Sequence, residues 1–267
     1  MRDINDYAEK YIDEPCEKYQ VFYRRKHVLQ IMKNYPHRTI LEVGCGLEPL
    51  FPYIDHYDKL VVVEPVKVFV DNLKLVIMQN HAQDKVCFLH GFLEKEADRI
   101  LQMGINFDYI VVSGLLHELD DPYEFLEAVK KLCSENTVIH INVPNARSIH
   151  RLIAKEMGII LNIYELSELQ IRMQKRRVYD FELLVETVEK AGFEVLEHGS
   201  YLPKFLTSRQ MEEILERGII GEEIFYGLDQ LSRYLPEYGS EIYVQVKRKE
   251  NGILAILGNG NHQKPTV

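Results

Sequence analysis

Two acidic residues, Glu42 and Glu64, each stand at the end of an apolar run. A Gly-x-Gly turn formed by Gly44 and Gly46 directly follows the first run, and Glu64 comes eighteen residues after Gly46. This spacing predicts a strand, a glycine turn, a helix and a second strand with an acid at its tip. A unit of this kind holds a cofactor that carries a nucleoside, because a strand-end acid can accept hydrogen bonds from ribose hydroxyls.

Two side chains around the turn indicate which cofactor binds there. A dinucleotide site has a third glycine three residues after the second, where this chain has Pro49. Glu42 would repel a pyrophosphate and attract an ammonium group. S-adenosylmethionine has no phosphate and carries both an ammonium and a sulfonium, so it is the predicted cofactor, with Glu64 on its ribose. A nicotinamide oxidoreductase remains as an alternative.

The rest of the chain alternates between strand-like and helical patterns. Strand-like runs occupy residues 39–43, 59–63, 86–89, 108–112, 137–142, 193–199 and 241–247. Helical patterns occupy residues 5–34 with a break at Pro15, 66–81, 95–103, 122–132, 180–191 and 205–236. Such alternation predicts an α/β, Rossmann-like, doubly wound and mostly parallel seven-stranded sheet that binds ligands at the carboxyl ends of its strands.

Composition excludes several classes of protein. The net charge is −9 and no run of Lys and Arg exceeds three, so we expect no nucleic-acid partner. The four cysteines form no C-x-x-C pair, which is typical of reduced thiols in the cytoplasm. The first residues lack a signal-peptide core, and no apolar stretch approaches the ~20 residues of a membrane helix. We therefore expect a cytoplasmic protein with no membrane contact, and consider a homodimer.

The chain resembles class I S-adenosylmethionine-dependent methyltransferases over roughly residues 20–248. The segments that carry the resemblance are 41–46, 61–65, 107–122 and 139–145. The third reads Phe-Asp-Tyr-Ile-Val-Val-Ser-Gly-Leu-Leu-His-Glu-Leu-Asp-Asp-Pro, and in such enzymes the strand before this loop ends beside the sulfonium. The Asn-Val-Pro-Asn-Ala-Arg-Ser-Ile-His-Arg stretch is similar to a branch with small-molecule and sugar-type acceptors.

The resemblance implies transfer of a methyl group to a hydroxyl of a sugar, nucleotide-sugar or related small metabolite. A quinone-type phenol or an amine is the alternative acceptor. A non-catalytic module that binds S-adenosylmethionine is the alternative from another class. The fourth strand is followed by Ser113, Gly114 and Leu115 rather than by an Asn/Asp-Pro-Pro-Tyr motif, which argues against methylation of DNA bases or of protein glutamine.

The resemblance also implies a domain plan. Residues 1–35 form an N-terminal helical lid, residues 36–249 the methyltransferase domain, and residues 250–267 a flexible tail. A helical insertion at about 147–178, after the fifth strand, forms the acceptor side together with the helices of 205–236.

The expected cofactor contacts come from the strand ends and the lid. They are Tyr11, Tyr19, Glu42, Gly44, Gly46, Glu64, Pro65, Gly91, Phe92, Ser113, Gly114 and Leu115.

Transfer to a hydroxyl requires a base, and histidine titrates in the right range. His117 follows the fourth strand and is the first candidate, with helix capping or packing as the alternative. His150 is the second candidate, with a solvent-facing position as the alternative. No metal is expected, because Asp120 and Asp121 lack a third ligand and Asp108 lies at the start of a strand.

The expected acceptor contacts combine amides, arginines and two tyrosines. They are Asn142, Asn145, Arg147, Arg151, Arg177, Tyr179, Tyr201 and Lys204. The arginines, with Arg176, suit a nucleotide diphosphate or a carboxylate on the acceptor, since Arg binds such groups through two hydrogen bonds. The alternatives are a solvated helix face for the arginines and a backbone turn for Asn142 and Asn145.

Overall fold

The computed structural model describes residues 4–12 and 18–249 of the chain. The expected helix break at Pro15 and the expected tail at 250–267 lie outside these residues.

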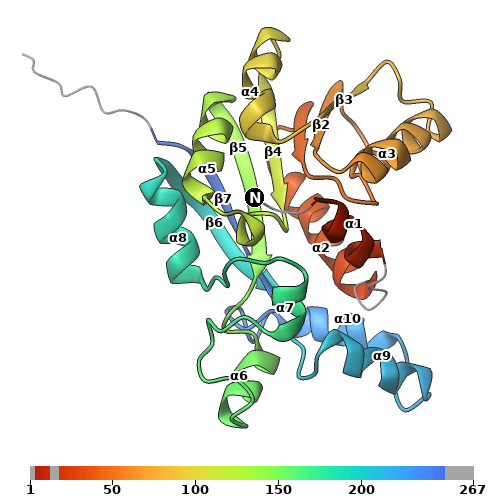
Figure 1. Ribbon diagram of the computed structural model, residues 1–267, viewed down its shortest axis with the longest axis vertical. Helices are drawn as coiled ribbons and strands as arrows, with labels where there is room; N and C mark the ends of the chain where they lie inside the picture. The colour runs from red at the N-terminus through yellow and green to blue at the C-terminus, as the bar shows by residue number, and fades with distance from the viewer. Residues whose placement is uncertain (1–3, 13–17, 250–267) are drawn as a thin grey trace, which may run out of the picture.

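A single sheet of seven strands forms the centre of the molecule (Figure 1). The strand order is β3-β2-β1-β4-β5-β7-β6, and only β7 runs antiparallel to its neighbours β5 and β6. The strands are β1 Thr39–Val43, β2 Lys59–Glu64, β3 Val86–His90, β4 Phe107–Ser113, β5 Cys133–Pro144, β6 Phe193–Tyr201 and β7 Glu241–Arg248. This is the predicted Rossmann-like fold, with β5 beginning earlier than the sequence pattern indicates.

The register of the central strands brings their carboxyl ends to one edge. Val43 at the end of β1 pairs with Val63 of β2 on one side and with Val112 of β4 on the other. The residues that follow these three positions therefore emerge together at the same edge. This is the edge at which doubly wound sheets bind their ligands.

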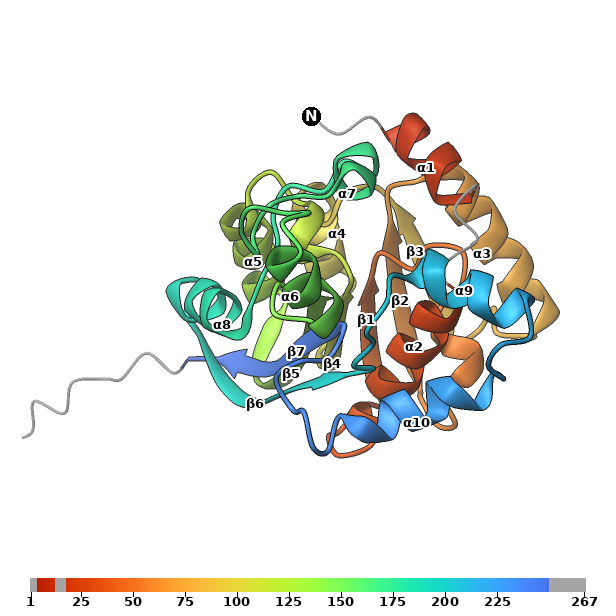
Figure 2. The ribbon, with the colours of Figure 1, turned by 90° about the horizontal axis from the view of Figure 1, so that it is seen from below.

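Helices cover both faces of the sheet (Figure 2). They are α1 Ile4–Ile12, α2 Lys18–Met32, α3 Lys67–Gln79, α4 Leu93–Gln102, α5 Pro122–Lys131, α6 Ile149–Glu156, α7 Glu168–Arg172, α8 Phe181–Lys190, α9 Ser208–Glu216 and α10 Glu223–Leu231. Successive strand residues point to opposite faces, so Leu41 packs with α4, α5 and α8 while Ile40 packs with α2 and α3. Helix α5 begins at Pro122, where the helical pattern of the sequence begins, and the side chain of Asp121 accepts hydrogen bonds from the amides of Tyr123 and Glu124.

Two segments depart from the regular alternation and lie on the ligand edge. The stretch from β5 to α8 contains the short helices α6 and α7, and a capping box at Ser167 begins α7. The region expected to be helical from 205 to 236 forms two helices, α9 and α10, since Gly218 takes a left-handed backbone (φ 66°) after α9. Within the described residues, no helix has both the length and the apolar character needed to cross a bilayer.

Candidate active site

The turn after β1 is shaped by its two glycines. Gly44 and Gly46 have φ values of 76° and 55°, a backbone region that side chains with a Cβ enter only with strain. The amide of Gly46 donates to Oε2 of Glu64 (3.1 Å), and the amide of Val66 donates to Oε1 (2.8 Å). The acid at the tip of β2 is thereby held against the glycine turn.

Glu42 lies beneath the same turn and is almost completely buried. The amide of Leu50 donates to its carboxylate at 3.1 Å. Burial raises the pKa of Glu42 to about 8, and the neighbouring charge of Glu64 adds to the rise. Two buried acids therefore share a small volume, and a cationic ligand would relieve their repulsion.

Helix α1 lies over the turn. The ring of Tyr11 packs edge-on against Phe69 of α3 (5.4 Å between centroids). Its hydroxyl is 3.5 Å from the position that a Cβ on Gly46 would occupy. From the other side of the opening, Gln174 donates to the carboxylate of Asp6 in α1 (2.7 Å), so α1 touches the segment that follows α7.

A cleft of about 1250 Å³ opens along this edge of the sheet. Ligand sites for one drug-sized molecule are usually about 300–1,000 Å³, so the cleft has room for a cofactor and a second molecule. It is lined by eleven of the twelve residues expected to bind the cofactor: Tyr11, Glu42, Gly44, Gly46, Glu64, Pro65, Gly91, Phe92, Ser113, Gly114 and Leu115. Tyr19 lies elsewhere, because it donates to Glu222 (2.6 Å) and stacks on Phe225.

His117 enters the cleft from a short 3-10 helix, η3 Leu116–Glu118, directly after β4. Its side chain is buried, and its Nε2 lies 3.8 Å from Oε1 of Glu118. The amides of Arg176 and Arg177 donate to the carbonyl of His117, at 3.0 and 3.3 Å. The insertion thus fixes the backbone of the residue that points into the cleft.

His150 lines the same cleft from the first turn of α6. Its Nδ1 is buried and makes no hydrogen bond to the part of the chain that the structure describes. Burial lowers the pKa of His150 to about 3, and the positive charges of Lys204 and Arg151 lower it further. His150 is therefore neutral at ordinary pH.

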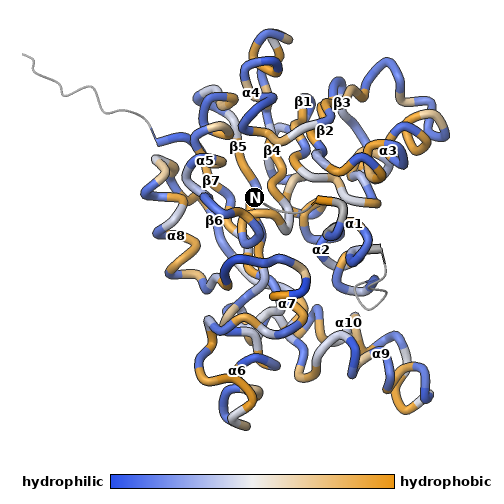
Figure 3. Tube along the Cα trace, viewed as in Figure 1, coloured by the Kyte–Doolittle hydropathy of each residue, from blue (hydrophilic) through white to orange (hydrophobic). Residues whose placement is uncertain are grey.

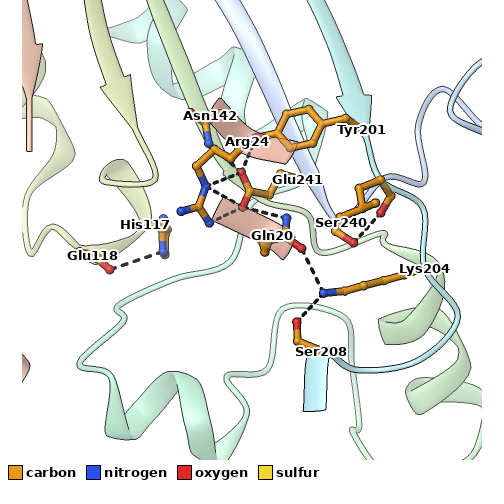
Figure 4. Close-up of polar contacts among 11 residues, drawn as sticks. Gln20, Arg24, His117, Glu118, Asn142, Tyr201, Lys204, Ser208, Ser240 and Glu241 are labelled. Atoms are coloured by element: carbon orange, nitrogen blue, oxygen red, sulfur yellow. Dashed lines mark hydrogen bonds and ion pairs between the residues drawn. The ribbon is translucent and has the colours of Figure 1, made fainter. Parts of the chain in front are cut away.

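A buried carboxylate, Glu241 at the start of β7, is the centre of a network of polar side chains (Figure 4). Gln20 and Arg24 of α2 donate to it, as do Asn142 of β5 and Tyr201 of β6. Sequence reasoning did not find Gln20, Arg24 or Glu241, since nothing in the local pattern links residues more than two hundred positions apart. The network ties α2 to three strands beside the tip of β4.

Lys204 extends this network into the cleft from the β6–α9 loop. Its ammonium donates to Gln20 (3.1 Å) and to Ser208 (2.7 Å). Leu202 holds a left-handed backbone (φ 54°), a strained state for a branched residue, and Ser240 donates to its carbonyl through both its amide and its hydroxyl. This turn lies two residues before Lys204 and is held to the start of β7 by Ser240.

Comparison with known proteins identifies the family. The family model of a methyltransferase domain matches residues 16–198. The chain belongs to this methyltransferase family. A comparison with curated proteins gave no match.

Solved structures share the fold of the methyltransferase at low sequence identity. An S-adenosylmethionine-dependent methyltransferase from Mesorhizobium loti has a TM-score of 0.54 at 11% identity, covering 88% of this chain and 99% of that one. A phosphoethanolamine N-methyltransferase of Haemonchus contortus, solved with S-adenosylhomocysteine, has a TM-score of 0.56 at 13% identity, covering 84% and 53%. The [4+2]-cyclase SpnF has a TM-score of 0.55 at 14% identity, covering 84% and 79%.

S-adenosylmethionine is the cofactor of this class I methyltransferase, as predicted. The residues present suit it. The paired acids Glu42 and Glu64 match a ligand with cationic groups and ribose hydroxyls, and the glycine turn leaves room where a Cβ would meet Tyr11. Among the described residues, no group of three or more His, Cys, Asp or Glu is arranged to hold a metal ion.

Only some of the residues expected to bind the acceptor line the cleft. Asn145, Arg151 and Lys204 line the cleft, as does His150. Asn145 and Arg151 are also occupied structurally: Asn145 donates to the carbonyls of Glu237 and Gly239, and Arg151 donates to those of Ile163 and Glu165.

The other expected acceptor residues lie outside the cleft lining. Asn142 and Tyr201 are bound to Glu241, and Tyr179 is fully buried in the core. Arg177 donates to the carbonyls of Leu119 and Asp120, while Arg147 is exposed. Arg176 pairs with Asp120 (2.7 Å). The arginines therefore do not converge on one point, because Arg151 and Arg177 bind backbone carbonyls of different loops, Arg176 pairs with Asp120 and Arg147 is exposed.

Proposed function

We propose that this methyltransferase transfers a methyl group to a hydroxyl of a small metabolite that carries an anionic group, such as a sugar phosphate or a nucleotide-linked sugar. The observation that carries the proposal is the buried His117 at the tip of β4, facing a cleft that also contains Lys204. S-adenosylmethionine supplies the electrophilic methyl group when bound. The protein positions the acceptor and removes its proton.

His117 is the proposed base. A hydroxyl becomes a competent nucleophile as its proton leaves, and histidine titrates near neutrality. The carboxylate of Glu118, 3.8 Å from Nε2, would stabilise the imidazolium formed in that step. The two hydrogen bonds from the 176–177 backbone to the carbonyl of His117 restrict the motion of the base.

Positive charge on the acceptor side supports an anionic acceptor. The chain has a net charge of −9, yet Lys204 and Arg151 both line the cleft with little exposure to solvent. Their charges both act on His150, which lines the same cleft. The H. contortus structure contains a phosphate-bearing small molecule, phosphomonomethylethanolamine, which is consistent with such an acceptor on this fold.

An amine is the second candidate nucleophile. Glu118 is a buried carboxylate that lines the cleft beside His117, and a carboxylate there could hold an ammonium group before its proton is lost. The H. contortus protein that shares this fold is an N-methyltransferase, which is consistent with a nitrogen acceptor. The hydroxyl remains the first proposal because Lys204 and Arg151, which both line the cleft, would repel the positive charge of an ammonium acceptor.

Of the segment 1–35 that was expected to form a lid, we propose that α1 has this role, because α2 packs against the sheet. The contact of Tyr11 with the glycine turn and that of Asp6 with Gln174 support this role, since both must open before a cofactor enters under α1.

The test is release of S-adenosylhomocysteine from the purified protein with sugar phosphates, nucleotide sugars, phenols and amines as acceptors. We expect turnover with a hydroxyl acceptor, lost in His117→Ala and kept in the exposed-residue control His56→Ala. Calorimetry should show that His117→Ala still binds S-adenosylhomocysteine. Turnover only with amines would favour the second candidate, while cofactor binding with no turnover on any acceptor would favour a non-catalytic module.

A further inference from the structure

The loop after α6 exposes an unusual run of apolar side chains. Residues 157–161 read Met-Gly-Ile-Ile-Leu, and Met157, Ile159 and Leu161 are 68%, 66% and 86% exposed. No charged residue interrupts them. In Figure 3, the trace beside α6 is coloured orange, which marks hydrophobic residues. Exposed apolar clusters of this kind usually mark a binding surface.

The exposed loop continues into the cleft. Ile159 and Ile160 line the cleft together with Ala154 of α6. Leu169 of α7 and the buried Met173 that follows it line the same region. Apolar side chains from three parts of this segment, at Ala154, at Ile159 and Ile160, and at Leu169 and Met173, therefore line the cleft among polar neighbours such as Glu168 and Gln170.

The facing wall is polar. The β6–α9 loop contributes Lys204, Thr207, Ser208 and Arg209 to the cleft lining. The acceptor half of the cleft thus has one wall that suits an anion or hydroxyls and one that suits hydrocarbon. His117 lines the same cleft.

We propose that the acceptor is amphiphilic: its reactive polar end lies near His117 and Lys204, and an apolar body or chain lies along Ile160 and Ile159 toward the rim. This inference rests on the proposed methyl transfer and narrows its substrate class. Two residues of the loop select this occupant, because Ile159 and Ile160 line the cleft as well as belonging to the exposed apolar run. A partner protein or a second copy of the chain would cover the rim residues, but it would not reach the buried Met173.

The chain supplies a matched control. Ile219 follows Gly218 and precedes Ile220, as Ile159 follows Gly158 and precedes Ile160. Ile219 is 67% exposed, which equals the exposure of Ile159 within one per cent, but it does not line the cleft. Replacing either isoleucine with serine removes the same side chain from a similar glycine-containing loop.

The experiment measures binding of butyl, hexyl and octyl phosphate, below their micelle concentrations, to protein saturated with S-adenosylhomocysteine. We expect affinity to rise two- to fourfold for each added methylene, because each buried methylene adds hydrophobic free energy. In Ile159→Ser and Ile160→Ser the dependence on chain length should flatten, and in Ile219→Ser it should stay as in the unaltered protein.

Three outcomes would overturn the inference. The first is an affinity for alkyl phosphates that does not depend on chain length. The second is a loss of the chain-length dependence in Ile219→Ser equal to that in Ile159→Ser. The third is a shift from dimer to monomer in Ile159→Ser with no change in alkyl phosphate binding, which would assign the loop to contact with a second copy of the chain. Failure of the proposed methyl transfer can be distinguished from failure of this inference. It would appear as no binding of S-adenosylhomocysteine before alkyl phosphates are added, or as no turnover with any class of acceptor.

Discussion

The guanidinium of Arg24 forms a buried ion pair with the carboxylate of Glu241, with Nε 2.9 Å from Oε1 and 3.0 Å from Oε2. Arg24 belongs to the helix before the first strand, and Glu241 is the first residue of the last strand. The same guanidinium lies 3.6 Å from the position of a Cβ on Gly114, at the tip of β4. One ion pair thereby joins α2, the acceptor side and the loop that carries the proposed base.

Protonation of Glu241 should destabilise the fold in acid. Burial alone would raise its pKa, but the charge of Arg24 and the hydrogen bonds to Arg24, Tyr201 and Gln20 outweigh burial and hold the pKa at about 2. A carboxyl whose pKa is depressed stabilises the folded state above its unfolded pKa, near 4.5, and loses that contribution as pH falls toward 2. The full loss is about 3 kcal/mol.

Urea unfolding at pH 7 and pH 3 measures this contribution. Glu241→Gln should be less stable at pH 7 and should show a smaller difference between the two pH values. Glu186→Gln, an exposed control on α8, should keep the difference of the unaltered protein. An unchanged pH dependence in Glu241→Gln would show that other carboxylates control the acid transition.

Gly46→Ala should affect both stability and cofactor binding, because the new Cβ must adopt a left-handed backbone and lies 3.5 Å from the hydroxyl of Tyr11. Gly104→Ala provides the control, since Gly104 also has a positive φ (65°) but faces open space. Each variant should lose about 1 kcal/mol of unfolding free energy. Only Gly46→Ala should weaken S-adenosylhomocysteine binding in calorimetry; equal binding in both variants would place the ligand elsewhere.

Glu42→Gln should stabilise the ligand-free protein and should reduce the further stabilisation that S-adenosylhomocysteine provides. The raised pKa of Glu42, about 8, means that the folded state becomes less stable as pH rises from about 4.5 to 8. Glutamine removes this cost but also the charge that attracts an ammonium group. Thermal unfolding at pH 8.5 should therefore show a higher Tm without ligand and a smaller increase on adding S-adenosylhomocysteine. Glu127→Gln, exposed on α5, should change neither value.

Lys204→Met should raise the KM for an anionic acceptor at least tenfold with a smaller change in kcat, because the lost charge contributes to binding rather than to the reacting bond. The KM of the unaltered protein should increase with salt, and that of the variant should respond less. Lys131→Met on the exposed face of α5 is the matched control. A KM that Lys204→Met leaves unchanged would remove Lys204 from acceptor binding.

The cofactor half of the site could be predicted because its signals are local. The two glycines and the acids at the strand tips lie within 25 residues of one another, and the alternation of strand and helix fixes the edge where they meet. The loop after β4 follows its strand directly in the sequence, so the position of His117 at this edge of the sheet could also be predicted, and His117 lines the cleft.

The acceptor half could not be predicted in the same way. Its central carboxylate, Glu241, binds Gln20 and Arg24 across 221 and 217 positions of sequence, and only the folded sheet brings them together. Arg177 and Tyr179 were expected to face the acceptor from their residue types, but Arg177 binds loop carbonyls and Tyr179 is packed in the core. Residue type indicates what a side chain can bind, whereas the insertion decides which of them reach the cleft.

The position of β7 between β5 and β6 has a consequence for the order of folding. β1, β2 and β4, with the cofactor turn, can pair with one another long before β7 is synthesised, because they are close in sequence. β6 has no partner in the sheet until β7 arrives, and Glu241 arrives with it. Pulse-labelled hydrogen exchange should therefore show early protection of the first group and late protection of β6 and β7. The methyltransferase would acquire its place for the cofactor first and its place for the acceptor only when β7 closes the sheet.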